Sequence, residues 1–174
     1  IKSLNTKEKL QIDLHEIKSY DKKILKLVIN CLKVCNITDG LDIEIYCDFD
    51  PGTGLGGSSR LVLAIVKGIT TLFGIEISHR QLIKIAYTIE REKTEISGGW
   101  QDQIISAYGG LCFTEFSNDG FNTKKIQLES EHIDNLNSCL FITKVGNTRS
   151  SDQIHRKQEK YKTDMGYIKN LSNI

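Results

Sequence analysis

The feature that most constrains the fold is a glycine-rich turn between an alternating segment and an apolar one. Residues 41–49 (LDIEIYCDF) alternate apolar and polar side chains, which is the pattern of a half-buried β-strand. Residues 51–60 (PGTGLGGSSR) follow, and Ser59 to Phe73 is apolar on most sides, which predicts a largely buried helix. Backbone N–H groups at such a turn and the dipole of the helix favour an anion. The turn therefore predicts a phosphate site with the hydroxyls of Ser58 and Ser59 at its rim.

Two nucleotide-binding motifs and one purely structural arrangement compete with this interpretation. Gly52, Gly54 and Gly57 fit the G-x-G-x-x-G pattern of dinucleotide-binding oxidoreductases. That pattern follows a strand that is apolar throughout, whereas residues 41–49 alternate, so we keep it as a remote alternative. The Walker loop fails because no lysine follows Gly57. A helix simply capped by Ser58 would need none of the glycines, each of which adds to the entropy lost on folding.

The whole chain, residues 1–174, is predicted to form one α+β domain. Ser78 and Gln81 form a capping box for a helix that carries Glu90 and Glu92 near its end. The turn at residues 117–120 (SNDG) predicts a hairpin. Further helices are expected at residues 20–36 and 100–108 and beyond residue 148, and further strands at residues 111–116, 123–128 and 138–145.

Composition points to a small-molecule partner. The chain has 23 basic and 22 acidic residues and a formal charge of +1, so no basic face argues for nucleic acid. We find no leader and no apolar run near the ~20 residues of a membrane span, and expect a cytoplasmic protein. The cysteines lack zinc-type spacing and are expected as reduced, mostly buried thiols. The histidines stand in polar surroundings and are expected at the surface: His15, His79, His132 and His155.

Three stretches together resemble one family, the galactokinase, homoserine, mevalonate and phosphomevalonate kinases (GHMP kinases). They are residues 51–60, residues 90–110 (EREKTEISGGWQDQIISAYGG) and residues 141–154 (FITKVGNTRSSDQI). The sugar-kinase branch, above all the heptose 7-phosphate kinases, is most similar. The resemblance implies the family's N-terminal ATP-binding domain, a two-layer α/β sandwich like ribosomal protein domain 2, with a mixed or antiparallel sheet packed by helices. It also implies that the domain is incomplete at its N-terminus and that the C-terminal GHMP domain is missing.

The same resemblance implies ATP-dependent phosphorylation of a hydroxyl on a sugar or sugar phosphate, with Mg²⁺ as the second cofactor. Asp102 matches the catalytic base; otherwise it is a helix N-terminal charge. Ser58 and Glu90 match the magnesium ligands, with Glu92 as the fallback for Glu90 and a solvated helix residue as its structural alternative. The positions matched to ATP are Pro51, Gly52, Gly54, Leu55, Gly56, Gly57, Ser58 and Ser59, and those matched to the substrate are Gly99, Gln101, Asp102, Gly146, Thr148 and Arg149.

Departures from the family pattern leave alternatives open. Gly57 stands where the family has a serine, and Arg60 where it has a small residue. A catalytically silent ligand-binding or regulatory relative, or a truncated copy, is therefore an alternative to the enzyme. A second copy of the chain, as a homodimer, is a further candidate partner. Trp100, the only tryptophan, adjoins Asp102 and is expected either to stack on a sugar or to pack in the core.

Overall fold

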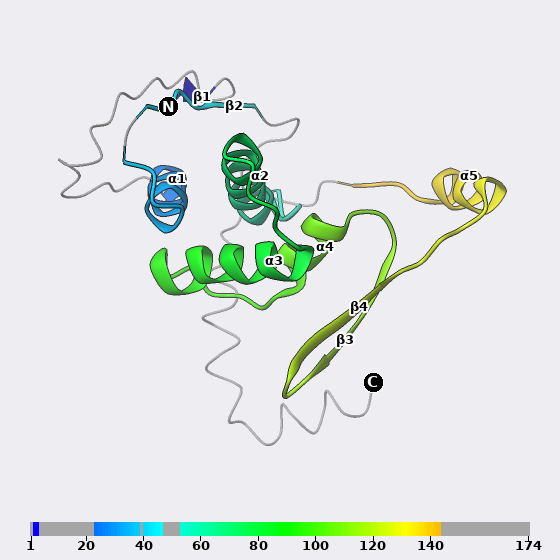
Figure 1. Ribbon diagram of the computed structural model, residues 1–174. Coiled ribbons are helices and arrows are strands. Elements are labelled where there is room, and N and C mark those ends of the chain that lie inside the picture. The colour runs from blue at the N-terminus through cyan, green and yellow to red at the C-terminus, as the bar shows by residue number, and fades with distance from the viewer. Residues whose placement is uncertain (1, 4–22, 39, 47–52, 144–174) are drawn as a thin grey trace, which may run out of the picture.

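The computed structural model describes residues 2–3, 23–38, 40–46 and 53–143. Helices α1, α2, α3 and α4 pack together, and a hairpin and helix α5 project from them (Figure 1). The architecture is α+β, as expected. In chain order the elements are β1 (Lys2–Ser3), α1 (Lys23–Val34), β2 (Glu44–Ile45), α2 (Gly57–Leu72), α3 (His79–Tyr87), the π-turn η1 (Thr88–Lys93), α4 (Gln101–Tyr108), β3 (Cys112–Ser117), β4 (Gly120–Lys125) and α5 (Ser130–Cys139).

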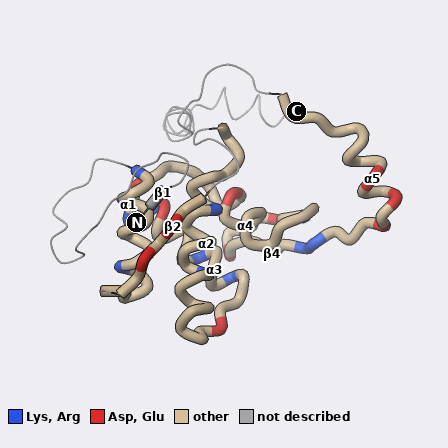
Figure 2. Tube along the Cα trace, turned by 90° about the horizontal axis from the view of Figure 1, so that it is seen from above, with Lys and Arg blue, Asp and Glu red and all other residues tan. Residues whose placement is uncertain are grey.

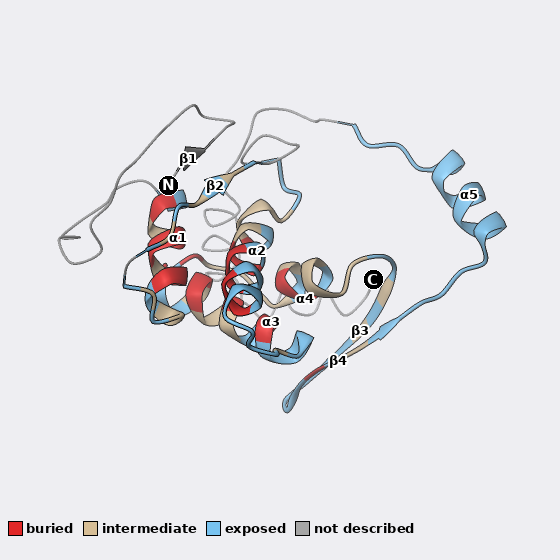
Figure 3. Cartoon of the chain, turned by 45° about the horizontal axis from the view of Figure 1, so that its top comes forward, coloured by how far each residue is buried: buried red, intermediate tan, exposed pale blue. Residues whose placement is uncertain are grey.

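The hydrophobic core lies where α1, α2 and α3 meet, and the buried residues gather on their facing sides (Figure 3). Apolar residues recur at intervals of three and four along each helix, so each helix presents one continuous apolar stripe. Burial of each large aliphatic side chain stabilises the fold by about 1.5–3 kcal/mol. The centre of this core contains Leu27, Val28, Cys31, Val62, Val66, Ala86 and Ile89.

Helix α2 begins two residues before the expected Ser59, and Ser58 does not cap it. Gly56 occupies the N-cap position with φ +69°, and no side chain caps the helix. This left-handed backbone costs a residue with a Cβ about 1–2 kcal/mol, which accounts for a glycine here. Ser58 lies inside the first turn, and its hydroxyl is thereby available to another partner.

Helix α3 starts at the expected capping box and then changes into a π-turn. The Ser78 hydroxyl accepts a hydrogen bond from the backbone N–H of Gln81, and the Gln81 side chain accepts one from the backbone N–H of Ser78. From Thr88 the backbone widens: the N–H of Thr94 donates to the carbonyl of Ile89 at 3.0 Å, an i→i+5 bond. The turn holds both Glu90 and Glu92, so its geometry decides where these acids point.

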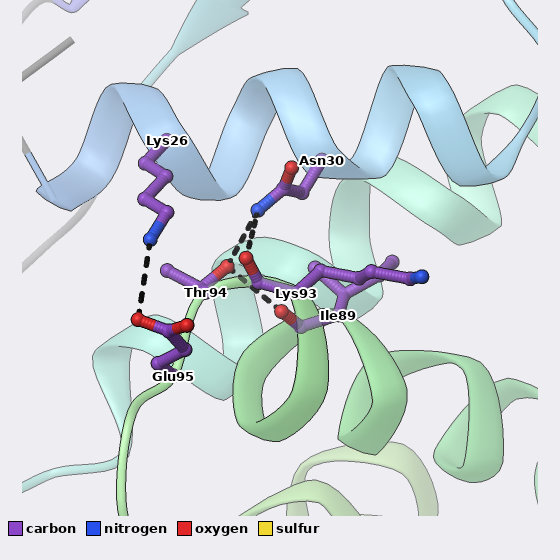
Figure 4. A network of polar contacts seen from close by, with 6 residues as sticks. All are labelled: Lys26, Asn30, Ile89, Lys93, Thr94 and Glu95. Atoms are coloured by element: carbon purple, nitrogen blue, oxygen red, sulfur yellow. Dashed lines mark hydrogen bonds and ion pairs between the residues drawn. The ribbon is translucent and has the colours of Figure 1, made fainter. Parts of the chain in front are cut away.

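Helix α1 fixes the end of this π-turn (Figure 4). The Asn30 amide donates to the Lys93 carbonyl at 3.0 Å and to the Thr94 hydroxyl at 2.9 Å. That hydroxyl in turn donates to the Ile89 carbonyl at 2.7 Å. Lys26 and Glu95 add an exposed ion pair at 3.9 Å, which contributes little by itself. Residues more than 60 positions apart thus close the turn, and no local sequence signal marks it.

The strand expected at residues 41–49 is described as far as Tyr46. Its predicted alternation is confirmed over that range, because Leu41, Ile43 and Ile45 pack against the core while the residues between them are exposed. Only Glu44–Ile45 is paired, in parallel with Lys2–Ser3. Cys47 and Phe49 lie outside the described residues.

The hairpin is confirmed, although its second strand is Gly120–Lys125 and not the expected 123–128, and the strand expected at residues 138–145 is wrong. β3 and β4 pair antiparallel around the Ser117–Gly120 turn. Ser138 and Cys139 instead end helix α5, which has no buried residue, and Phe141 and Ile142 are 87% and 88% exposed. A strand needs a hydrogen-bonded neighbour, and none of the described strands pairs with this apolar stretch. The helix expected beyond residue 148 lies outside the described residues.

Cysteines and charges complete the description. Cys31 is buried, Cys35 and Cys112 are half-buried and Cys139 is exposed, so the expectation of mostly buried thiols holds only in part. All of these are free thiols, while Cys47 lies outside the described residues.

Acidic and basic residues both occur along the described trace, and helix α5 carries acidic ones (Figure 2). No described helix combines the length and the apolar content that crossing a bilayer demands.

Candidate functional site

The π-turn, the start of α2 and the start of α4 bring polar side chains together beneath the glycine-rich turn. The centre is Glu90, whose side chain is completely buried. A buried carboxylate is costly unless donors surround it, and Glu90 has them on both oxygens. Oε1 accepts from the Ser58 hydroxyl at 2.6 Å, and Oε2 accepts from the Ser59 hydroxyl at 2.6 Å and from the Gln103 amide.

These donors give the two oxygens of Glu90 different surroundings. Ser59 and Gln103 are completely buried, so Oε2 is fixed toward the interior. Ser58 is only half-buried at the first turn of α2, next to the glycine loop. Oε1 is therefore the oxygen on the side of the loop, covered by the Ser58 hydroxyl. Ser59 was expected at the rim of the loop, whereas its hydroxyl is turned to Glu90 inside the protein.

Asp102 lies against the glycine-rich turn from the opposite side. It is a half-buried residue of the first turn of α4. A Cβ placed on Gly56 would lie 3.7 Å from Cγ of Asp102, in ordinary van der Waals contact. The structure thus brings together Ser58, Glu90 and Asp102, of which the first and last are 44 residues apart in the sequence.

The oxygen atoms at Ser58 and Glu90 fit a magnesium ion. Mg²⁺ binds oxygen at about 2.0–2.1 Å in an octahedron, so neighbouring ligand oxygens lie about 2.9 Å apart. The Ser58 Oγ and Glu90 Oε1 atoms are 2.6 Å apart and need to separate only slightly. The buried Oε1 of Gln103, whose amide nitrogen bonds the other oxygen of Glu90, has no hydrogen-bond partner among the described residues. The described residues hold no cluster of three His, Cys, Asp or Glu for a metal, but Mg²⁺ often takes only one or two carboxylates.

Arg91, the neighbour of Glu90, organises the segment that leads to Asp102. Its guanidinium donates to the carbonyls of Ile96 at 3.0 Å, Ser97 at 3.4 Å and Gly99 at 2.9 Å. Trp100 follows and stacks on Tyr87, with ring centroids 3.6 Å apart and planes at 5°. Trp100 also contacts Phe121, so it packs within the protein, the second of the two expectations for it.

The remaining predicted residues fall in three groups. Gly54 and Leu55 are exposed on the turn and Gln101 on α4, while Gly57 and Gly99 are half-buried. Glu92 is exposed and makes only a long contact with Thr88 at 3.4 Å, so the fallback ligand points away from the site. Arg60 is exposed and does not disturb the packing of α2. His79 and His132 are exposed, as expected, and the residues outside the described ranges are Pro51, Gly52, Gly146, Thr148, Arg149, His15 and His155.

The sequence-based site omitted Gln103 and Arg91. Gln103 directly follows the proposed base, and Arg91 is the one cation between two acids near the end of a predicted helix. Either signal could have suggested a link to Glu90 or to the following loop. Their acceptors, however, come from the tertiary structure.

The chain is similar in sequence and in fold to several kinases. A D-glycero-α-D-manno-heptose 7-phosphate kinase of Campylobacter jejuni is 31% identical over 122 residues, 66% of this chain and 35% of that protein. A mevalonate kinase of Saccharolobus solfataricus is 30% identical over 122 residues, 68% of this chain and 38% of that protein. The crystal structure of a D-glycero-D-manno-heptose 1-phosphate kinase from Bacteroides thetaiotaomicron superposes with a TM-score of 0.61 at 30% identity, over 74% of this chain and 43% of that one. The chain therefore spans less than half the length of these relatives.

The family model decides between the interpretations of the glycine-rich turn. The model for the GHMP kinases N terminal domain matches residues 19–110, which include the turn, Glu90 and Asp102. The dinucleotide-binding alternative is wrong: helix α2 is followed by α3 with no described strand between them. The chain belongs to the GHMP kinases.

Proposed function

We propose that this protein is an ATP-dependent kinase that phosphorylates a hydroxyl of a sugar or sugar phosphate. The observation that carries the proposal is the buried Glu90 carboxylate, which meets the Ser58 hydroxyl at the start of α2 while Asp102 lies across Gly56. A helix with only a structural role would keep its carboxylates at the surface. Glu90 is instead buried and bonded to a serine beside the glycine-rich turn. The relatives named above as kinases of heptose phosphates support the class of acceptor.

The turn and the first residues of α2 would hold the phosphates of ATP. The first N–H groups of a helix have no partners within it, and the helix dipole adds positive potential at this end. Gly56 and Gly57 carry no side chain that would keep a phosphate away. Ser58 and Glu90 would hold Mg²⁺, which neutralises charge on the phosphates when it is bound.

Asp102 would act as the general base of the transfer. The oxygen of the acceptor hydroxyl attacks the γ-phosphorus, and its proton passes to the Asp102 carboxylate. The bond from the γ-phosphorus to the bridging oxygen breaks, and ADP leaves with that electron pair. The protein contributes mainly position and charge to such a reaction, and the rigid placement of Asp102 against the loop serves that purpose.

The acceptor would be bound on the side of Asp102 that Gly99 and Gln101 flank. We assign the recognition of a phosphate on the substrate to Gly146, Thr148 and Arg149, by the resemblance of residues 141–154 to the sugar-kinase branch. A guanidinium offers a planar pair of donors that matches a phosphate. Arg149→Lys should then raise the KM of a sugar phosphate more than that of the same sugar without phosphate.

Calorimetry of ATP binding with and without Mg²⁺ tests the metal and nucleotide assignment. We expect Glu90→Gln and Ser58→Ala to remove most of the gain in affinity that Mg²⁺ provides. Glu92→Gln is the matched control, because Glu92 lies on the same π-turn but is exposed, and it should behave like the parent. An effect of Glu92→Gln that equals that of Glu90→Gln would contradict the assignment.

Transfer is tested separately by incubation with ATP, Mg²⁺ and a panel of sugars and sugar phosphates. Formation of a phosphorylated product is the expected result. Magnesium-dependent ATP binding without transfer to any member of the panel would favour the alternative, a catalytically silent ligand-binding protein.

A further inference from the structure

Arg91 is a half-buried cation whose hydrogen bonds all go to one loop. Its guanidinium donates to three backbone carbonyls between Ile96 and Gly99, and no carboxylate among the described residues pairs with it. A cation away from water is costly unless hydrogen bonds satisfy it. Both Nη atoms have such bonds, while the buried Nε has no partner among the described residues, so the guanidinium depends on this loop. The planar fork suits this task, because its donors reach carbonyls in different directions at once.

The π-turn connects this arrangement to the site. Glu90 and Arg91 are consecutive, yet Glu90 points to the start of α2 while Arg91 points to residues 96–99. One short turn therefore places both the proposed magnesium ligand and the loop that leads into α4. Trp100, the N-cap residue of α4, follows directly, and Asp102 lies two residues further on.

Two aromatic rings connect Arg91 to the start of α4. The Arg91 guanidinium lies 5.9 Å from the centroid of Tyr87, and Tyr87 stacks on Trp100 at 3.6 Å. Gly98 leaves room for the guanidinium, since a Cβ there would come within 2.7 Å of Arg91 Nη2. A side chain at position 98 would therefore shift the end of Arg91 away from its acceptors, and the backbone itself, with φ +152° at this residue, also favours glycine.

We propose that Arg91 is a positioning residue for the acceptor: it fixes residues 96–99 and the start of α4, so that the acceptor is aligned with Asp102 and the phosphate loop. The inference rests on the proposed function in assigning the acceptor to this side of the site. The hydrogen bonds and the stacking that carry it are independent of that function. Arg91 touches neither ATP nor the acceptor, and its effect passes through the loop.

Steady-state kinetics of Arg91→Lys provide the functional test. A lysine amine is a single point charge and cannot satisfy carbonyls at Ile96 and Gly99 together. We expect kcat/KM for the acceptor to fall about 10- to 100-fold, the range for a small misplacement of reacting groups. The Kd of Mg·ATP should change less than about twofold, because Glu90 keeps its partners. An equal loss for ATP and acceptor would indicate a general structural role and overturn the proposal.

Trp100 fluorescence provides a readout that needs no activity. Trp100 is the only tryptophan, so quenching by acrylamide reports the packing of this loop directly. Arg91→Lys should increase the quenching constant. The matched control is Arg60→Lys, since Arg60 is an exposed arginine of α2, and it should leave quenching near the parent value.

Gly98→Ala tests the same contact from the other side and covers the case in which Arg91→Lys does not fold. The new methyl group would displace the end of the Arg91 side chain, and φ +152° at this residue adds backbone strain in the same loop, so both effects should be at least as large as in Arg91→Lys. If the parent transfers phosphate to no acceptor, the proposed function fails, while the quenching still decides whether Arg91 holds the loop. Quenching constants equal to the parent in both variants would overturn the inference whatever the activity.

Discussion

The two serines at the start of α2 each bond a different oxygen of Glu90, so a pair of matched substitutions tests whether Oε1 serves magnesium binding and Oε2 serves stability. Ser59 is completely buried and donates to Oε2 at 2.6 Å. Loss of a hydrogen bond to a charged group costs about 1.5–3 kcal/mol, while the higher helix propensity of alanine offsets this by up to about 0.5 kcal/mol. We therefore expect Ser59→Ala to lower the free energy of unfolding by about 1–2.5 kcal/mol.

Ser58→Ala should behave in the opposite way. Ser58 is half-buried, so water can replace its hydroxyl as a donor to Oε1, and the same gain in helix propensity applies. The expected loss of stability is about 0–1 kcal/mol. The gain in ATP affinity from Mg²⁺ should nevertheless be largely lost in Ser58→Ala and largely kept in Ser59→Ala, where Gln103 still holds Oε2.

Urea denaturation and calorimetry of both variants measure the two effects side by side. The reasoning predicts that the larger loss of stability and the larger loss of magnesium dependence fall on different serines. If one variant shows both, the two oxygens of Glu90 are not functionally distinct. If Ser58→Ala destabilises as much as Ser59→Ala, water does not reach this side of the site.

Further predictions concern the base, the cap and the buried thiol. Asp102→Asn should slow transfer by about 10²- to 10⁴-fold with the Kd of Mg·ATP nearly unchanged, as measured by single-turnover kinetics and calorimetry. Ser78→Ala removes the N-cap of α3 and should cost about 0.5–2 kcal/mol in urea denaturation. Burial, and secondarily the charge of Cys35, raises the pKa of the Cys31 thiol from 9.0 to about 12. The unfolded thiol ionises first, so Cys31 should not affect the pH dependence of stability below about pH 9 and should lower stability from there to about pH 12. The fall between pH 8 and 10 should therefore be smaller in Cys31→Ala.

Helices α1 to α4 were predictable because each carries its own signal in the sequence. Helix α5 was not predicted, and neither was the pairing of the terminal strands, because strand pairing depends on distant partners. The apolar stripe of α1 and the capping box of α3 are complete within their own sequences, and both elements are confirmed. The alternation of residues 41–46 correctly predicts which side chains face the core, but the length of the pairing depends on a distant segment. The apolar residues near Phe141 have the composition of a strand and no described partner, which explains the wrong prediction there.

The choice between Glu90 and Glu92 shows how far sequence periodicity can lead to the site. Glu90 stands four residues after Ala86 and eight after Leu82, so it falls on the apolar stripe of its helix, where an acid is out of place. Glu92, however, stands three residues after Ile89 and seven after Ile85, so it falls on that stripe as well, yet the structure has Glu90 buried and Glu92 exposed. Periodicity alone therefore does not separate the two acids. It also does not show that Oε1 and Oε2 have different partners, because the π-turn that sets the orientation of the carboxylate is closed by Asn30 from another helix. The sequence narrows the choice to two acids, whereas the burial of one of them and the direction of its oxygens are properties of the tertiary structure.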